Sequence, residues 1–247
     1  YESIGRERET ADANFFPEYY VLPVGKDLQK NELEAYKMVQ YLLRNGVKVE
    51  QTTTPVSVDG VTYPAGTYVV NMHQAKRGYA NLVLYDGLDV SDFDAMYSDT
   101  VQNFADMRGF DRYISRSAGA FTGKTQQVSS VVIPTTNLDQ YAFAQNYVIR
   151  NSNNDAIKAV NELLANHKAV TLLSKSNLRT VASKYLLDLV PFSTTGDKTG
   201  KLLKPANVGI AGAPSFILAD LGFKVTTDTA AADVLVNAGT SLIASGK

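Results

Sequence analysis

The sequence repeats one order of elements, a strand followed by a helix and a second strand. Residues 19–23 form a short β-rich run that Pro23 ends. Asn31, with Glu34 three positions later, predicts a capping box, and the apolar residues that follow have helical spacing. Gly46 predicts the end of this helix, and residues 47–49 return at once to a strand.

The same order occurs twice more. Residues 147–149 predict a strand, Asn153 or Asn154 a helix cap, and residues 169–173 the returning strand. A partial third copy begins at residues 208–212, with Pro214 at the first helical position, Gly222 at the helix end and residues 223–225 as the next strand. The three copies predict an α/β chain with two doubly wound units and mostly parallel sheets.

Between the copies, residues 56–63 contain two alternating runs around Asp59-Gly60, which predicts a β-hairpin insertion. A strand is expected over 67–70 and helices over 75–85 and 92–107.

Residues 115–130 are rich in Ser, Gly, Thr and Gln, which predicts a loop or linker. We therefore expect a first α/β domain with the hairpin insertion over 1–130 and a second α/β domain over 131–247. The chain begins at Tyr1 without an initiator Met, and residues 240–244 begin an element just before Lys247. We expect an excised segment whose second domain is truncated.

Composition excludes several kinds of site. The 247 residues contain no Cys, which excludes a disulfide framework, a thiolate zinc site and a cysteine nucleophile. The two histidines are His73 and His167, so a triad or a multi-histidine metal site would have to use one of them. The formal net charge of −1 argues against a nucleic-acid partner, and no apolar run approaches the ~20 residues of a membrane span.

Acidic residues gather in one region but lack the spacing of an EF-hand calcium loop. We interpret Ser91 and Asp92 as the cap and first turn of a helix. The members of this acidic region are Asp86, Asp89, Asp92, Asp94, Asp99 and Asp106.

Other candidate positions lie outside the acidic region. Residues 209–213 meet a helix N-terminus that could hold an anion, but they match neither glycine-rich phosphate motif. His73 follows a strand, which favours either a site at the strand end or a capping or surface role. His167 falls in the last turn of a helix, whereas Lys184 and Tyr185 are ordinary amphipathic content. No catalytic or metal-ligating residue is assigned, and the binding residues are unknown.

Two stretches resemble a known family. Residues 46–49 followed by Asp59-Gly60-Val61-Thr62-Tyr63-Pro64-Ala65-Gly66-Thr67-Tyr68-Val69-Val70 and Gln74 resemble the region after the catalytic domain of large bacterial zinc carboxypeptidases of the carboxypeptidase A type. Residues 85–86 and 109–111 look like its continuation. Residues 204–210 and 233–236 are similar to the start of its glutamine-amidotransferase-like module. The resemblance covers residues 18–112 well and 140–240 loosely.

In that family a His-x-x-Glu pair and a distant His hold zinc. Here Lys76 stands three residues after His73 and Val170 three after His167, so no zinc ligand transfers, and the missing Cys excludes amidotransferase chemistry. The resemblance implies a secreted or cell-surface parent peptidase, with zinc only in its catalytic domain. This segment would be a non-catalytic accessory part whose partners are the catalytic domain of the same chain and a peptide or peptidoglycan ligand.

Two alternatives remain open from the sequence. One is a two-lobed α/β module that binds peptide or cell-wall sugar between its lobes, with some of the 14 Tyr residues as stacking surfaces. The other is a free-standing hydrolase with a site around His73 and the acidic region.

Overall fold

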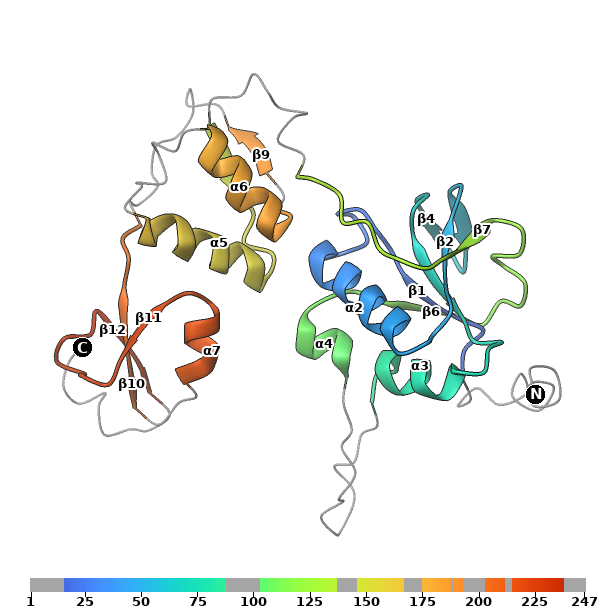
Figure 1. The fold of residues 1–247 in the computed structure, drawn as a ribbon, viewed down its shortest axis with the longest axis horizontal. Coiled ribbons are helices and arrows are strands. Elements are labelled where there is room, and N and C mark those ends of the chain that lie inside the picture. Colours follow the sequence, from blue (N-terminus) through green and yellow to red (C-terminus); the bar gives the residue numbers. More distant parts are fainter. Residues whose placement is uncertain are drawn as a thin grey trace, which may run out of the picture. The chain divides into compact units, whose positions relative to one another are not determined.

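The structure is a computed structural model that describes residues 16–87, 103–136, 146–166, 175–187, 189–192, 203–211 and 215–237. The chain divides into two compact units, Tyr1–Ile133 and Pro134–Lys247. Helices and sheets occur in both units, so the chain is of mixed α/β class (Figure 1). None of the described helices is long and apolar enough to cross a membrane.

The first unit is built on a five-stranded sheet with the order β6-β1-β5-β2-β7. Every neighbouring pair in this sheet is antiparallel. The prediction of a mostly parallel, doubly wound sheet is therefore wrong for the first unit. In chain order the strands are β1 (Tyr19–Leu22), β2 (Val49–Thr52), β5 (Tyr68–Asn71), β6 (Tyr113–Ser115) and β7 (Thr125–Val128).

Helix α2 (Glu32–Arg44) joins β1 to β2 and confirms the first strand–helix–strand prediction. The Asn31 side chain caps it by accepting a hydrogen bond from the backbone N–H of Glu34 at 3.1 Å. Gly46, with a φ of 78°, follows the helix in the left-handed conformation that glycine tolerates best. The buried face of the helix consists of Leu33, Ala35, Tyr36, Met38, Val39 and Leu42.

The position of β5 explains why the sheet is antiparallel. It lies between β1 and β2 and runs opposite to both. Strands β1 and β2 therefore run parallel to each other, as a strand–helix–strand unit requires, but β5 separates them. A short return from the hairpin brings β5 alongside β2, and antiparallel strands need only such short connections.

The hairpin consists of β3 (Val56–Val58) and β4 (Val61–Tyr63), as predicted. Asp59 and Gly60 both have positive φ, 51° and 80°, which is the conformation of a type I′ turn. The hairpin packs through a cluster made of Tyr19, Val21, Val56, Tyr63, Val69 and Phe121.

Two short helices complete the described part of the first unit. Helix α3 (Arg77–Leu84) confirms the helix expected at 75–85. Helix α4 (Phe104–Arg108) overlaps the end of the helix expected at 92–107, most of which falls outside the described residues.

The interpretation of residues 115–130 as a loop or linker is wrong in part. Strand β7 lies inside this range and pairs with β2 from Val49↔Val128 to Thr52↔Thr125. Polar Thr and Gln side chains suit a half-exposed edge strand, so their presence did not distinguish a strand from a loop. Phe121, in the same range, is buried in the cluster under the hairpin.

The second unit begins with β8 (Asn146–Ile149), α5 (Asn154–Ala165), α6 (Lys175–Tyr185) and β9 (Leu189–Phe192). Asn153 caps α5, since its side chain accepts from the backbone N–H of Ala156 at 3.0 Å. Strands β8 and β9 pair antiparallel, in contrast to the parallel pairing expected here. The expected returning strand at 169–173 lies outside the described residues.

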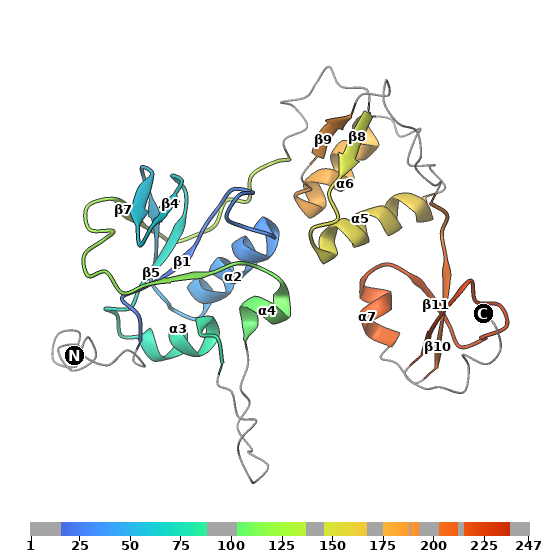
Figure 2. The same cartoon turned by 180° about the vertical axis from the view of Figure 1, so that it is seen from behind.

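The strand–helix–strand order of the third copy is confirmed in the second unit, while Gly212 and Pro214 lie outside the described residues. Strands β10 (Asn207–Ala211), β11 (Lys224–Thr226) and β12 (Val234–Asn237) form a parallel sheet with the order β11-β10-β12, of which Figure 2 labels β10 and β11. Helix α7 (Ser215–Asp220) connects β10 to β11, and Gly222 follows it with a φ of 81°. At Gly209 an added Cβ would lie 2.7 Å from the Ala232 Cβ as well as 2.6 Å from the Leu235 side chain, so this close contact requires glycine.

Candidate functional site

His73 follows β5, and its ring lies against a carboxylate that precedes β1. Its Nε2 is 3.0 Å from Oε2 of Glu18, whose side chain is only 6% exposed, whereas the imidazole is 41% exposed. The antiparallel β1–β5 register brings these two residues together although 55 positions separate them. Sequence reasoning missed Glu18 because only that register reveals the pair. The contact joins the start of β1 to the end of β5.

His167 lies outside the described residues, and so do four members of the acidic region together with Ser91. Asp106 is a first-turn residue of α4, where its backbone N–H donates to Asn103 at 3.0 Å. Asp86 instead forms an ion pair with Arg112. Among the residues that the structure describes, no three His, Asp, Glu or Cys side chains gather as metal ligands would.

Arg112 forms a deeply buried cationic contact in the first unit. Its side chain is 6% exposed, and its guanidinium carbon lies 5.5 Å from the centre of the Tyr20 ring. The Tyr20 hydroxyl donates to Oδ1 of Asn81 at 2.7 Å. Burial raises the pKa of Tyr20 to about 12, against the opposing effect of Arg112, so the phenol stays protonated near neutral pH and acts as a donor.

One hydrogen-bond donor of the Arg112 guanidinium has no acceptor among the described residues. Its NH2 group meets the mostly exposed Asp86 carboxylate, while its buried Nε has no hydrogen-bond partner. No sequence motif around Arg112 predicted this arrangement. Chemically, it is a buried cation that lies over an aromatic ring and is paired with the Asp86 carboxylate.

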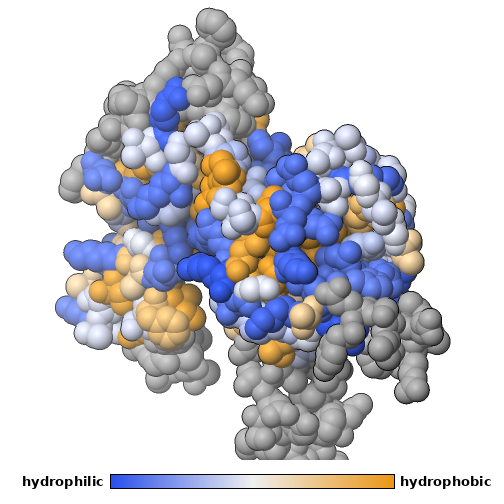
Figure 3. All heavy atoms as spheres, turned by 45° about the vertical axis from the view of Figure 1, so that its right-hand side comes forward, coloured by the Kyte–Doolittle hydropathy of each residue, from blue (hydrophilic) through white to orange (hydrophobic). Residues whose placement is uncertain are grey.

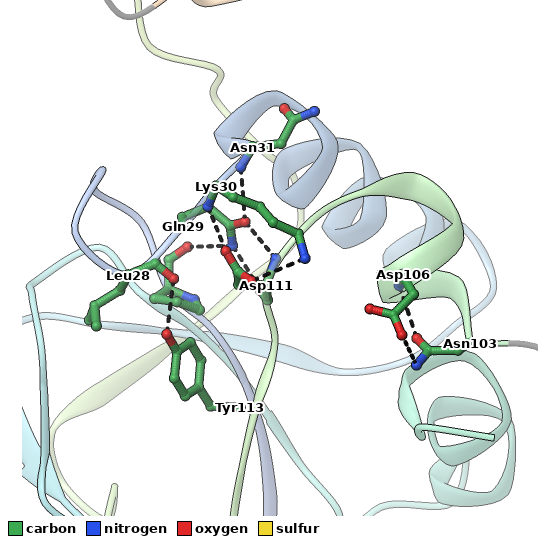
Figure 4. A network of polar contacts seen from close by, with 9 residues as sticks. Leu28, Gln29, Lys30, Asn31, Asn103, Asp106, Asp111 and Tyr113 are labelled. Carbon is green, nitrogen blue, oxygen red and sulfur yellow. Dashed lines mark hydrogen bonds and ion pairs between the residues drawn. The ribbon is translucent and has the colours of Figure 1, made fainter. Parts of the chain in front are cut away.

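A second polar network surrounds Gln29 and Asp111 (Figure 4). Two residues beyond Val21↔Tyr113 the antiparallel register would place Pro23 opposite Asp111, but Pro23 has no backbone N–H to donate. The Gln29 side chain replaces it: its amide nitrogen donates to the backbone oxygen of Asp111 at 2.8 Å, and its amide oxygen accepts from the backbone N–H of Asp111 at 2.7 Å. The same amide nitrogen donates to the Pro23 oxygen at 3.2 Å. The Gln29 side chain therefore takes the place of the next backbone hydrogen bonds between β1 and β6.

The turn of the hairpin is also fastened to the sheet. Ser115 and Ser117 each donate a hydroxyl hydrogen bond of 2.6 Å to the carboxylate of Asp59. These two bonds hold the pKa of Asp59 below its ordinary value. Asp59 therefore contributes both a turn conformation and a link to β6.

In the second unit, Lys184 and Tyr185 tie α6 to α5. The Lys184 ammonium and the Tyr185 hydroxyl donate to the Glu162 carboxylate at 2.6 Å and 2.8 Å. The first of these bonds is the larger cause that lowers the pKa of Glu162. The two residues interpreted as ordinary amphipathic content thus make a helix–helix contact at the surface.

Only residues 209–211 of the expected anion site are described. A shallow hollow of about 490 Å³ lies between α7 and β11. Phe216 on its rim is 71% exposed, and Figure 3 shows apolar atoms at the surface of the region that contains α7, in the lower left. The hollow is lined by Ser215, Phe216, Ala219, Val225, Thr226 and Thr227.

The polar groups of the first unit thus mainly hold strands and turns to one another, and the hollow of the second unit is lined by hydroxyls and one exposed ring.

Comparison with models of protein families, with curated proteins and with solved structures finds no match to this chain.

Proposed function

We propose that this chain is a non-catalytic accessory segment of a zinc carboxypeptidase of the carboxypeptidase A type. The parent enzyme would be a secreted or cell-surface bacterial peptidase whose catalytic domain holds the zinc and hydrolyses peptides. The partners of the segment would be that catalytic domain and a peptide or peptidoglycan ligand.

One observation supports an accessory role above the others. The polar residues of the stretch that carries the resemblance are used to build the fold. Asp59 binds two serine hydroxyls, and Gln74 donates to the backbone oxygen of Lys48 at 3.0 Å and accepts from its N–H at 2.8 Å. Asn71 accepts from the backbone of His73, whose ring meets Glu18. Side chains committed in this way position strands and leave few polar groups for chemistry.

The doubly wound arrangement is proposed for the second unit only. We infer that β10, α7, β11 and β12 begin a doubly wound, amidotransferase-like module. The parallel order β11-β10-β12 supports this, since the chain leaves the central strand to one side and returns on the other.

The proposal is tested on the coding sequence and on the protein. The reading frame ahead of Tyr1 should encode a His-x-x-Glu segment and a further His. Purified 1–247 should contain zinc well below one atom per chain by elemental mass spectrometry and should release no C-terminal residues from peptides. Chelator-sensitive turnover that scales with the concentration of 1–247, and that His73→Ala abolishes, would place the chemistry in this chain and refute the accessory role.

The hollow beside α7 favours a second candidate, a module that binds peptide or cell-wall sugar. An exposed ring next to the hydroxyls of Ser215, Thr226 and Thr227 offers stacking and hydrogen bonding together, as sugar rings require. Muramyl dipeptide should then raise the unfolding temperature of the chain, and Phe216→Ala should remove the effect. An identical response from the variant would exclude this hollow as the binding place.

A further inference from the structure

The first-unit sheet has two edge strands, β6 and β7. Strand β6 has three residues and is followed by Arg116, and a charge beside an edge discourages pairing with other strands. Strand β7 has four residues; Lys124 precedes it, but no charged residue follows it before Asp139. An exposed edge whose own residues carry no charge is a template for an additional strand.

The backbone of β7 shows which groups are available. Thr53 donates its N–H to the backbone oxygen of Lys124 at 2.9 Å, so Lys124 faces β2. Because the facing direction alternates along an antiparallel strand, Gln126 and Val128 also face β2. Thr125 and Gln127 therefore point their N–H and C=O groups away from the sheet, and no hydrogen bond joins these outward groups to the described residues.

We propose that β7 binds an extended peptide by strand addition, with the outward backbone groups of Thr125 and Gln127 as its main contacts. This inference does not depend on the carboxypeptidase proposal, since it rests on the sheet edge alone. Strand addition obtains affinity from main-chain hydrogen bonds and so accepts many peptide sequences.

The size of the edge selects a peptide over a second copy of the chain. A four-residue strand is only about 13 Å long at roughly 3.3 Å per residue. Two such strands paired about a two-fold axis would bury much less than the ~1,600 Å² typical of a stable protein–protein interface. A single extended peptide needs no more than this length.

Amide hydrogen exchange measured by NMR tests the proposal residue by residue. The probe is the acetylated and amidated peptide Ser-Thr-Val-Thr-Val-Ser, added to the full 1–247 chain. When about nine-tenths of the protein is bound, exchange at Thr125 and Gln127 should slow by about tenfold, while Gln126 and Val128, already bonded to β2, should change little. The same peptide with every backbone nitrogen methylated should have no effect.

Gln127→Pro and Gln127→Ala are the matched variants. Proline removes an outward N–H that β2 does not use and is tolerated on edge strands, whereas alanine keeps the N–H. The proline variant should lose the protection of Thr125 by the peptide, and the alanine variant should keep it. Wild-type protein without alternating protection at millimolar peptide would overturn the proposal. Concentration-dependent protection of Thr125 and Gln127 without peptide, together with dimers in sedimentation, would also overturn it in favour of a second copy.

Discussion

The two units differ in the burial of the side chains that tie distant segments together. In the first unit, Gln29 and Gln74 are each 4% exposed and bond to the backbone of other segments. In the second unit Thr136 makes one such bond, to the backbone oxygen of Leu187. Other ties are exposed ion pairs: Lys158 and Asp220 pair at 2.7 Å with the aspartate side chain 70% exposed, and Lys184 is 56% exposed. Buried hydrogen bonds are costly to break, whereas exposed ion pairs contribute little. We infer that polar contacts define the first unit more strongly.

The helices also differ in how many side chains they bury. Helix α2 buries six and α5 of the second unit buries five, while α7 beside the small parallel sheet buries none among the described residues. The comparison indicates that substitutions in the core should destabilise the first unit most. The small parallel sheet of the second unit should be most sensitive to substitutions where its strands contact each other. The following changes test this in order of decreasing effect.

Leu42→Ala should give the largest effect. Leu42 is fully buried on α2, and removing a core leucine side chain costs about 2–5 kcal/mol. Hydrogen exchange followed by mass spectrometry should show lost protection throughout the first unit. Leu163→Ala, at a 2% exposed position of α5, is the matched change in the second unit. Equal loss of protection in both units from either variant would mean that the two unfold together.

Gly209→Ala should destabilise the parallel sheet of the second unit. The new Cβ would lie 2.6 Å from the Leu235 side chain and 2.7 Å from the Ala232 Cβ, and overpacking of this kind costs about 1–3 kcal/mol. Exchange in β10 and β12 should accelerate while the first unit is unchanged. Gly78→Ala is the control, because nothing lies within 4 Å of a Cβ at that position. Equal effects of the two variants would contradict the close strand contact.

Gln29→Ala should cost about 1–3 kcal/mol, because it leaves the N–H and C=O of Asp111 without the partner that replaces Pro23. Urea unfolding monitored by tyrosine fluorescence would measure the loss. The control is Lys30→Ala, which removes an ion pair to Asp111 whose lysine side chain is 44% exposed and should cost less than about 1 kcal/mol. If the two variants lose the same stability, the amide bridge is not a main support of this edge.

The smallest effect concerns acid stability. The pKa of Asp59 is lowered by the Ser115 and Ser117 hydroxyls, so its contribution is complete above the unfolded-state value near 3.8 and is lost as the pH falls through the lower folded value. Asp59→Asn should therefore flatten the pH dependence of first-unit stability below about pH 4. Glu162→Gln should do the same for the second unit, whose carboxylate has its pKa lowered by Lys184 and Tyr185. Unchanged acid slopes in thermal unfolding would show that neither contact persists in solution.

The candidate site residues were less predictable than the elements. The Asn31 cap and the Asp59-Gly60 turn depend on neighbours within a few residues, and both are confirmed. Glu18 against His73 and Gln29 against Asp111 join residues 55 and 82 positions apart. No local sequence pattern predicts such pairs, because they form only once the strands are paired in their native register.

The sequence by itself determined the local elements: capped α2, the type I′ hairpin, and the order of β10, α7 and β11. Capping, turn conformation and hydrophobic periodicity act over a few residues, which is why they can be read along the chain. Only the tertiary structure decided that β5 lies between β1 and β2, that residues 125–128 complete the sheet, and that β9 pairs antiparallel with β8. Strand partners are selected by the competition of all available edges and buried faces, a property of the folded chain as a whole.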